Sequence, residues 1–446
     1  MGTAGIRLKA WKRMSRRRRR YFNSKKSPPA DFWWVFIVLL LIVVALMPIT
    51  LKNSIAGPFT LSIFGVLFMI GGILTVKHFG DRQKIYVVPK MCKMAKRRAR
   101  KIQKNFKDSI LAEYLKMGVS TRYGIALPGV SVWVADDLDS GSVYIENLGA
   151  YGKLENSQVL ASLSGILPSP YEVVISDMVK GGAFVRFGFE DAETSHRFIV
   201  KNNDLRPFIS RDVHSLRLAD DLVWNARKVP HASIIGRTGS GKTMFTGGYL
   251  ANLANLQGWQ VIYASAKPDR FTKKFDGPTT PEQITIKAEQ LVEIMQERLT
   301  RIQELGVDDY GDIEGMNDIV FFIDEIGHLN ALLSVDKKLK VRFESAMSSL
   351  SFTGRSAGIH IIGVSQYATI EAFLPSAVRG NMKDCVIFLG GSASSGEERK
   401  FLIPGFSDLP QRSYRQGEGI ALVLGAGNKW TTPHFYETPL FEFSTN

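Results

Sequence analysis

The feature that most constrains this chain is Gly-Arg-Thr-Gly-Ser-Gly-Lys-Thr at residues 236–243, which fits the pattern G-x-x-x-x-G-K-T. The apolar run Ala232 to Ile235 precedes it and predicts a strand that ends where the glycines begin. Because glycines lack a Cβ, backbone amides in such a loop can approach phosphate oxygens closely. We therefore predict a strand, a phosphate-binding loop and a helix that opens at Lys242 and Thr243. A chance glycine turn is the alternative, and the flanking elements disfavour it.

The loop predicts a site for ATP and Mg²⁺. Lys242 is expected to reach the β and γ phosphates, and the Thr243 hydroxyl is expected to ligate Mg²⁺. Backbone amides of the loop and the helix N-terminus add donors and positive dipole. The residues expected to contact the nucleotide are Gly236, Arg237, Thr238, Gly239, Ser240, Gly241, Lys242 and Thr243, together with Asp324.

Two acids follow a second apolar run. Ile319 to Ile323 is typical of a central parallel strand buried on both faces, and it is followed by Asp324 and Glu325. We expect Asp324 to hold Mg²⁺ through water and Glu325 to polarise the attacking water. An acidic pair at a strand end is usually solvated, but beside a phosphate loop it indicates ATP hydrolysis.

Three further polar residues are candidates for the same site. Gln366 follows the predicted strand Ile359 to Val364, so it is expected to sense the bound nucleotide from the adjacent strand end. Arg355 lies between a helix and that strand, away from the expected phosphate pocket of its own subunit, and is a candidate finger for a neighbour's ATP. Arg379 competes for this role. A salt-bridged surface arginine is the alternative for both.

The charge of the chain is concentrated near its beginning. The first 107 residues hold 24 Lys and Arg against two acids, a net charge of +22, whereas the whole chain carries +15, so the remaining residues carry −7. Residues 1–31 are interpreted as a polybasic cytoplasmic tail attracted to anionic lipid, with a nucleic-acid arm as the alternative. The basicity therefore does not indicate that the rest of the chain binds nucleic acid.

Residues 32–76 predict a two-helix transmembrane hairpin with spans at about 32–51 and 55–76, because both stretches are uncharged and long enough to cross a bilayer. Lys and Arg flank the hairpin on both sides, so both termini are expected in the cytoplasm and the protein in the cell membrane. A secretory signal is the alternative, but the apolar run is long and no small-residue cleavage site follows it.

The region after the hairpin divides into two parts. Residues 77–118 contain a basic amphipathic helix, predicted from Pro89 to Met117, that either lies on the membrane or packs beside neighbours in an oligomer. Residues 119–228 alternate in short apolar runs and predict a small β-rich domain without a recognisable chemical site. Cys92 and Cys385 lack Cys or His neighbours at metal-ligand spacing, which fits a reducing compartment.

From residue 229 onward, strands alternate with helices, which predicts an α/β domain with a parallel sheet covered on both faces. Helices are expected at about 282–305 and 336–352. The expected strands after the phosphate loop are Trp259 to Ala264, Ile319 to Ile323, Ile359 to Val364, Cys385 to Leu389 and Gly419 to Leu424.

Five stretches in fixed order carry a family resemblance: GRTGSGKT, MQERLTRIQELGV, IVFFIDEIGHL, GRSAGIHIIGVSQ and VRGNMKDCVIF. Between about residues 213 and 424 the chain resembles the motor domain of FtsK/SpoIIIE-type DNA translocases of the HerA superfamily. Two N-terminal spans and a single motor are most like TcpA-type coupling proteins of conjugative elements. One departure is ASAKPDRF at 264–271, which lacks the Asp-Pro-Lys order usual after the second strand.

The resemblance implies that residues 229–446 form a RecA-like ATPase core that assembles into a homo-hexameric ring and moves DNA through its pore. Lys242, Thr243, Asp324, Glu325, Gln366 and Arg355 would take the roles given above. Pore loops of such rings follow the later strands, so four basic residues are candidate partners of DNA phosphates: Arg379, Lys383, Arg399 and Lys400.

The expected function is a membrane-anchored, ATP-driven DNA translocase that delivers relaxase-bound DNA to a conjugation channel. Three alternatives remain open: an FtsK-like ATPase of a protein secretion system, a chromosomal DNA-segregation translocase, and a membrane scaffold that binds nucleotide without hydrolysing it. Retention of both Asp324 and Glu325 argues against the scaffold.

Overall fold

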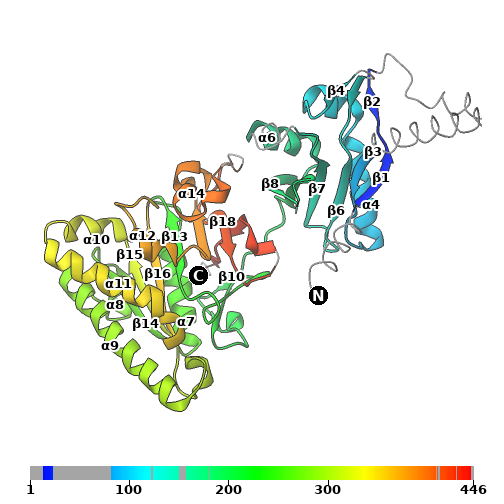
Figure 1. Cartoon of the computed structure of the whole chain (residues 1–446). Coiled ribbons are helices and arrows are strands. Elements are labelled where there is room, and N and C mark those ends of the chain that lie inside the picture. The colour runs from blue at the N-terminus through cyan, green and yellow to red at the C-terminus, as the bar shows by residue number, and fades with distance from the viewer. Residues whose placement is uncertain are drawn as a thin grey trace, which may run out of the picture. The chain divides into compact units, whose positions relative to one another are not determined.

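The computed structural model describes residues 14–23, 82–121, 124–149, 157–179, 181–407, 409, 412–427 and 429–442 (Figure 1). The chain forms two compact units, Met1–Asp191 and Ala192–Asn446. The predicted transmembrane hairpin, 32–76, lies outside the described residues. Within the described ranges, no helix combines the length and the apolar character that a membrane crossing requires.

The first unit is built on a four-stranded antiparallel sheet in the order β6-β7-β9-β8. Helix α4 (Lys93–Asn105) packs on this sheet through Ala95, Ala99 and Ile102, which are all buried. Most Lys and Arg side chains of α4 are exposed, whereas Arg98 is half-buried and lies over the Tyr171 ring. The strands are β6 (Val130–Val134), β7 (Ser140–Glu146), β8 (Tyr171–Met178) and β9 (Phe184–Asp191), and a second helix is α6 (Ser157–Ile166).

The predicted helix from Pro89 to Met117 is too long. Helix α4 ends at Phe106, whose buried ring and ψ of 66° take the backbone out of helical geometry. A short π-helix, η1 (Ile110–Tyr114), follows as a separate element. Helix α4 therefore covers the sheet with its apolar residues Ala95, Ala99 and Ile102.

The predicted polybasic tail is partly folded. Strand β1 (Met14–Arg18) pairs antiparallel with β3 (Arg82–Tyr86), and the register sets Arg18 opposite Arg82. The Arg19 guanidinium then donates to the buried carboxylate of Glu146 over 3.1 Å. This buried ion pair and the strand ladder explain why part of the basic segment belongs to the first unit. A short three-stranded sheet completes the unit: β2 (Tyr21–Phe22), β5 (Gly124–Ala126) and β4 (Val119–Thr121).

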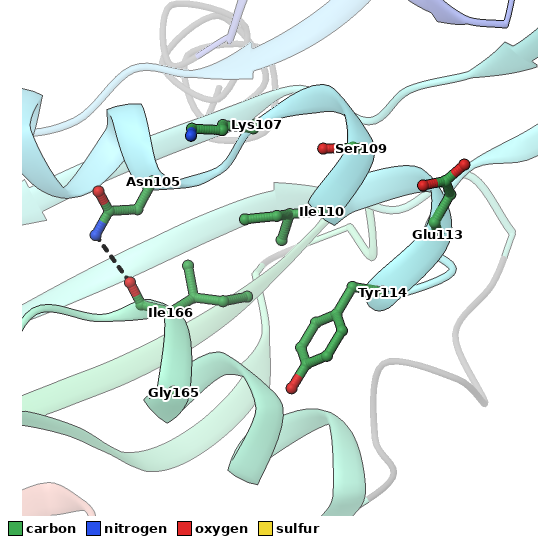
Figure 2. Close-up of a pocket in the computed structure, with 8 residues that line it drawn as sticks. All are labelled: Asn105, Lys107, Ser109, Ile110, Glu113, Tyr114, Gly165 and Ile166. Carbon is green, nitrogen blue, oxygen red and sulfur yellow. Dashed lines mark hydrogen bonds between the residues drawn. The ribbon is translucent and has the colours of Figure 1, made fainter.

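A hollow of about 710 Å³ lies in the first unit, between the end of α4, η1 and the end of α6 (Figure 2). Asn105 bridges its two walls by donating to the Ile166 carbonyl over 2.9 Å. None of the predicted site residues lines it.

The second unit contains a seven-stranded sheet in the order β14-β15-β16-β13-β17-β18-β19. The first five strands are parallel, but β18 runs antiparallel to both β17 and β19, so the expected parallel sheet is corrected at this edge. The connections before β18 and β19 contain only helices of seven residues or fewer, too short for a helix that crosses a sheet face. The strands are β13 (Ala232–Gly236), β14 (Gln260–Ser265), β15 (Ile319–Asp324), β16 (Ile359–Ser365), β17 (Cys385–Leu389), β18 (Glu418–Val423) and β19 (His434–Glu437).

Each face of this sheet is covered by its own hydrophobic cluster. In β15, Ile319, Phe321 and Ile323 belong to one cluster, whereas Val320 and Phe322 belong to the other. Figure 1 shows α9 and α11 side by side over the first of these faces. The covering helices there are α9 (Pro281–Leu305), α10 (Ile326–Leu333) and α11 (Lys337–Ala357), and the opposite face is covered by η3 (Met244–Ala251) and α7 (Asn252–Leu256).

The boundary between the units differs from the expected one at residue 228. Strand β10 (Ile199–Lys201) pairs in parallel with β20 (Leu440–Glu442), which ties residues after Asp191 to the C-terminal end of the second unit. Strands β11 (Ser215–Ala219) and β12 (Leu222–Asn225) add Trp224 to its core, where the indole is 1% exposed. Short alternating runs do not reveal which neighbouring sheet they complete, so the sequence misplaced this boundary.

Candidate nucleotide site

The predicted phosphate loop joins β13 to a helix, as expected. Strand β13 lies between β16 and β17 in the sheet, and it ends at Gly236. Gly239 and Gly241 have φ values of +82° and +97°, which side chains with a Cβ rarely adopt. The helix begins at Lys242 and continues into η3. The glycines are therefore needed for the path of the loop itself.

Lys242 folds back over the loop. Its ammonium donates to the carbonyl of Gly236 and, over 3.3 Å, to that of Arg237, and the side chain is 6% exposed. Burial lowers the pKa of Lys242, although Glu325 and Asp324 act in the opposite direction. The lysine thus lies within the electrostatic range of both predicted catalytic acids.

Asp324 is buried at the carboxyl end of β15. One carboxylate oxygen accepts from the Tyr263 hydroxyl over 2.9 Å, and the other accepts from the backbone amide of Glu325 over 2.9 Å. Burial raises the pKa of Asp324 to about 6; the negative charge of Glu325 adds to this rise, and the bond from Tyr263 opposes it. The carboxylate is therefore held in one orientation and carries a cost for its charge.

Glu325 adopts a left-handed backbone conformation, with φ of 53° and ψ of 48°. A residue other than glycine is uncommon there, and such conformations often mark functional sites. The turn caps α10 and directs the Glu325 carboxylate to Gln366, whose amide nitrogen donates to both carboxylate oxygens at 3.3 and 3.1 Å.

Gln366 connects the phosphate loop to Glu325. Its amide oxygen accepts from the Thr238 hydroxyl over 3.4 Å, while its amide nitrogen contacts Glu325. The sheet order explains this position, because β16 lies between β13, which leads into the loop, and β15, which leads into Glu325. One side chain at the end of the middle strand can therefore contact both neighbours.

Mg²⁺ has suitable ligands in this site. Hard divalent cations prefer oxygen donors, and both predicted ligands provide them: the Thr243 hydroxyl, which is exposed, and the Asp324 carboxylate. The Ser240 hydroxyl is buried in the loop and has no hydrogen-bond partner among the described residues, so the loop has an unused polar group of its own. The described residues hold no cluster of three or more His, Cys, Asp or Glu that could bind a metal ion.

Tyr263 and Thr246 belong to the site although the sequence analysis missed them. The Tyr263 hydroxyl lies 3.0 Å from the Thr246 hydroxyl and 2.9 Å from the Asp324 carboxylate. A tyrosine in the middle of a buried strand is usually a core residue, so no sequence signal distinguishes it.

Arg355 lies away from the phosphate loop of its own chain. It is exposed at the last turn of α11, and its guanidinium donates to the Arg227 carbonyl over 3.2 Å. Helix α11 leads into the amino end of β16, whereas Gln366 follows the carboxyl end of the same seven-residue strand. The strand spans roughly 23 Å, so Arg355 is not available to its own loop.

Two of the four predicted DNA contacts are corrected by the structure. Arg379 is 7% exposed and its guanidinium lies over the Phe401 ring at 5.4 Å; burial lowers its pKa. Arg399 is 2% exposed and donates to four backbone carbonyls, of Ala393, Phe406, Ser407 and Leu409. Both guanidinium groups hold local structure together and do not face solvent. Lys400 is exposed and Lys383 is half-buried, so these two stay predictions.

Comparison with known proteins finds one curated relative and several solved structures that resemble the chain. No family model matches it. The curated relative "DNA translocase FtsK" of Corynebacterium glutamicum is 23% identical over 350 residues, which cover 72% of this chain and 35% of that protein. The chain thus spans about a third of the length of the relative it matches.

One solved structure shares the fold, and others resemble it more weakly. The pCW3 conjugation coupling protein TcpA, in its monomer form with ATPγS, matches with a TM-score of 0.50 and 16% identity, covering 78% of this chain and 96% of that one. The cytoplasmic domain of the type VII secretion ATPase EccC of Thermomonospora curvata matches with a TM-score of 0.41 and 15% identity, covering 55% and 32%. The predicted resemblance is confirmed: the chain is similar in sequence to an FtsK translocase and in fold to a TcpA coupling protein, both FtsK/SpoIIIE-type ATPases.

Proposed function

We propose that the protein hydrolyses ATP to move DNA. The observation that carries this proposal is the position of Gln366, which contacts Thr238 of the phosphate loop and the Glu325 carboxylate. A side chain shared by the phosphate-binding and water-activating groups provides a direct link between nucleotide binding and hydrolysis. The resemblance to an FtsK translocase supports DNA as the substrate that this hydrolysis moves.

The chain's own groups suit the chemistry of phosphoryl transfer, which depends mainly on positioning and charge stabilisation. Lys242 neutralises charge on the β and γ phosphates, and the loop amides orient them. Glu325 accepts a proton from the attacking water. The Gln366 amide holds the Glu325 carboxylate until the γ-phosphate competes for that amide. Mg²⁺, held by Thr243 and by Asp324 through water, supplies further charge neutralisation when it is bound.

Attachment of the motor to a membrane is part of the proposal. The two predicted spans within 32–76 are apolar and uncharged, and two strands on either side of this stretch, β1 and β3, are antiparallel partners. Because β1 and β3 are neighbouring strands, the chain on either side of this stretch lies close together, which suits a two-span hairpin with both ends on the cytoplasmic side. The basic outer face of α4 would then lie close to anionic lipid.

The assembly would be a ring of six copies that acts as the coupling protein of conjugative DNA transfer, with a relaxase and channel proteins as partners. The fold shared with a conjugation coupling protein supports this choice over protein secretion. Lys383 and Lys400 would contact DNA phosphates, and such contacts weaken as salt rises.

ATP turnover of the full chain in lipid nanodiscs, with and without DNA, tests the proposal. We expect DNA to stimulate turnover and Lys242→Ala to abolish it, whereas Lys337→Ala, at an exposed position on α11, leaves it unchanged. Glu325→Gln should keep nucleotide binding and reduce turnover by about 10²-fold or more. Turnover that survives Lys242→Ala would exclude this site, and turnover stimulated by a small secreted protein instead of DNA would favour protein export.

A further inference from the structure

The buried hydroxyl of Tyr263 lies between the phosphate-loop helix and Asp324. On β14, its oxygen is 3.0 Å from the Thr246 hydroxyl and 2.9 Å from the Asp324 carboxylate. Tyr263 and Thr246 are 0% exposed and Asp324 is 4% exposed, so water does not replace these partners. The chemistry proposed above does not use the phenol, and its polar atom nevertheless lies at the centre of the site.

The hydrogen bonds of this group run in one direction. A hydroxyl has a single hydrogen, and an ionised carboxylate can only accept. Tyr263 therefore donates to Asp324, and Thr246 shares its one hydrogen between the Tyr263 oxygen and the Lys242 carbonyl. Hydrogen bonds arranged in such a chain polarise and strengthen one another.

The chain begins close to the phosphate-binding lysine. The Thr246 hydroxyl also lies 3.1 Å from the Lys242 carbonyl, one helical turn earlier. At the other end, the second Asp324 oxygen is already held by the Glu325 amide over 2.9 Å. With one donor on each oxygen, the carboxylate cannot rotate freely, and each oxygen keeps a lone pair for a water on Mg²⁺.

We infer that Tyr263 is a positioning residue: its hydroxyl fixes Asp324 for Mg²⁺ and, through Thr246, couples that acid to the phosphate-loop helix. The inference rests on the function proposed for the site. Residues that orient a metal ligand typically contribute about 10- to 100-fold to metal affinity. Because Asp324 is expected to act through water, the lower end of that range applies.

The test measures the Mg²⁺ dependence of nucleotide binding, without turnover. Binding of ATPγS to the full chain is titrated calorimetrically over a series of Mg²⁺ concentrations and in EDTA. We expect Tyr263→Phe to raise the Mg²⁺ concentration for half-maximal tightening by about tenfold, while the affinity in EDTA stays unchanged. A merely structural role would lower both affinities together.

Tyr249→Phe is the matched control, because that tyrosine is equally buried and donates to the Arg217 carbonyl over 2.8 Å, away from Asp324. It should leave the Mg²⁺ dependence unchanged. If Tyr263→Phe does not fold, Thr246→Val removes the other hydroxyl of the chain and should shift the Mg²⁺ dependence in the same direction. An unchanged Mg²⁺ dependence in the variant that folds overturns the inference alone, whereas a wild-type chain that binds no ATPγS overturns the proposed function.

Discussion

The burial of the Asp324 carboxyl determines the pH range in which its charge lowers the free energy of unfolding. An ordinary aspartate has a pKa of about 3.9, and burial raises that of Asp324 to about 6. Between these values the folded chain binds more protons than the unfolded chain, so the free energy of unfolding falls as pH rises through the interval. Above pH 6 the full cost of the buried charge is present.

Asp324→Asn should therefore stabilise the protein at pH 8 in the absence of nucleotide and Mg²⁺. The expected gain is about 3 kcal/mol, since the pKa rises by about two units and one pKa unit corresponds to about 1.4 kcal/mol. At pH 4, where the wild-type carboxyl is largely protonated in the folded chain, the difference should nearly vanish. Thermal unfolding of both proteins at the two pH values measures it. A stabilisation that is equal at pH 4 and pH 8 would contradict the role of charge.

At this scale the sequence predicted Lys242, Asp324, Glu325 and Gln366 as site residues because each lies after a strand in a recognisable pattern. It did not identify the left-handed turn at Glu325 or the bonds that Gln366 makes on both sides, because these depend on the strand order. For the same reason, the burial of Arg379 and Arg399 was missed: an arginine in a loop gives no sequence sign that carbonyls or an aromatic ring will surround it.

At the scale of elements, two helix ends offer a matched comparison. Helices α9 and α11 both end in a left-handed glycine, Gly306 with φ of 65° and Gly358 with φ of 69°. A methyl group at Gly358 would lie 2.4 Å from the Tyr310 ring, whereas at Gly306 it would meet no heavy atom of the described residues within 4 Å. Both positions therefore have a left-handed backbone that disfavours alanine, but only Gly358 is also crowded by a neighbouring side chain.

We expect Gly306→Ala to lower the free energy of unfolding by about 1 kcal/mol, the cost of a left-handed alanine. Gly358→Ala should add about 1–3 kcal/mol to that cost, because the Tyr310 ring must move in a packed core. Urea unfolding followed by tryptophan fluorescence measures both. Equal losses of unfolding free energy at the two positions would contradict this expectation, because the Tyr310 ring would then move aside without an energetic cost.

Elements with one dominant periodicity were predicted well. The strand at Cys385–Leu389 and the helix at about 282–305 appear almost as expected, because long apolar patterns and capping residues define them locally. The end of α4 at Phe106 and the antiparallel direction of β18 were missed. Both follow from contacts with distant segments, and the local sequence does not contain that information.

At the scale of the whole molecule, Arg355 bears on assembly. It is exposed and lies near the amino end of β16, whereas the phosphate loop follows the carboxyl end of the neighbouring strand β13. Any action of Arg355 on ATP must therefore take place in a second copy of the chain.

Arg355→Ala should keep ATPγS binding and lose turnover. Mixing it with the Lys242→Ala protein should restore part of the turnover, because a mixed ring contains interfaces with an intact lysine on one side and an intact arginine on the other. Lys340→Ala, at another position on α11, is the control. Turnover that stays absent in every mixture would contradict a role for Arg355 between copies.

The pairing of β10 with β20 also determines how the protein can be shortened for experiments. A fragment that starts at residue 229 would lack β11 and β12 and lose Trp224, leaving a large apolar hollow beside Trp259. Such a fragment would expose apolar surface and aggregate, even though its catalytic residues would all be present. A soluble fragment for biochemistry should instead begin at Ala192, where the compact unit itself begins.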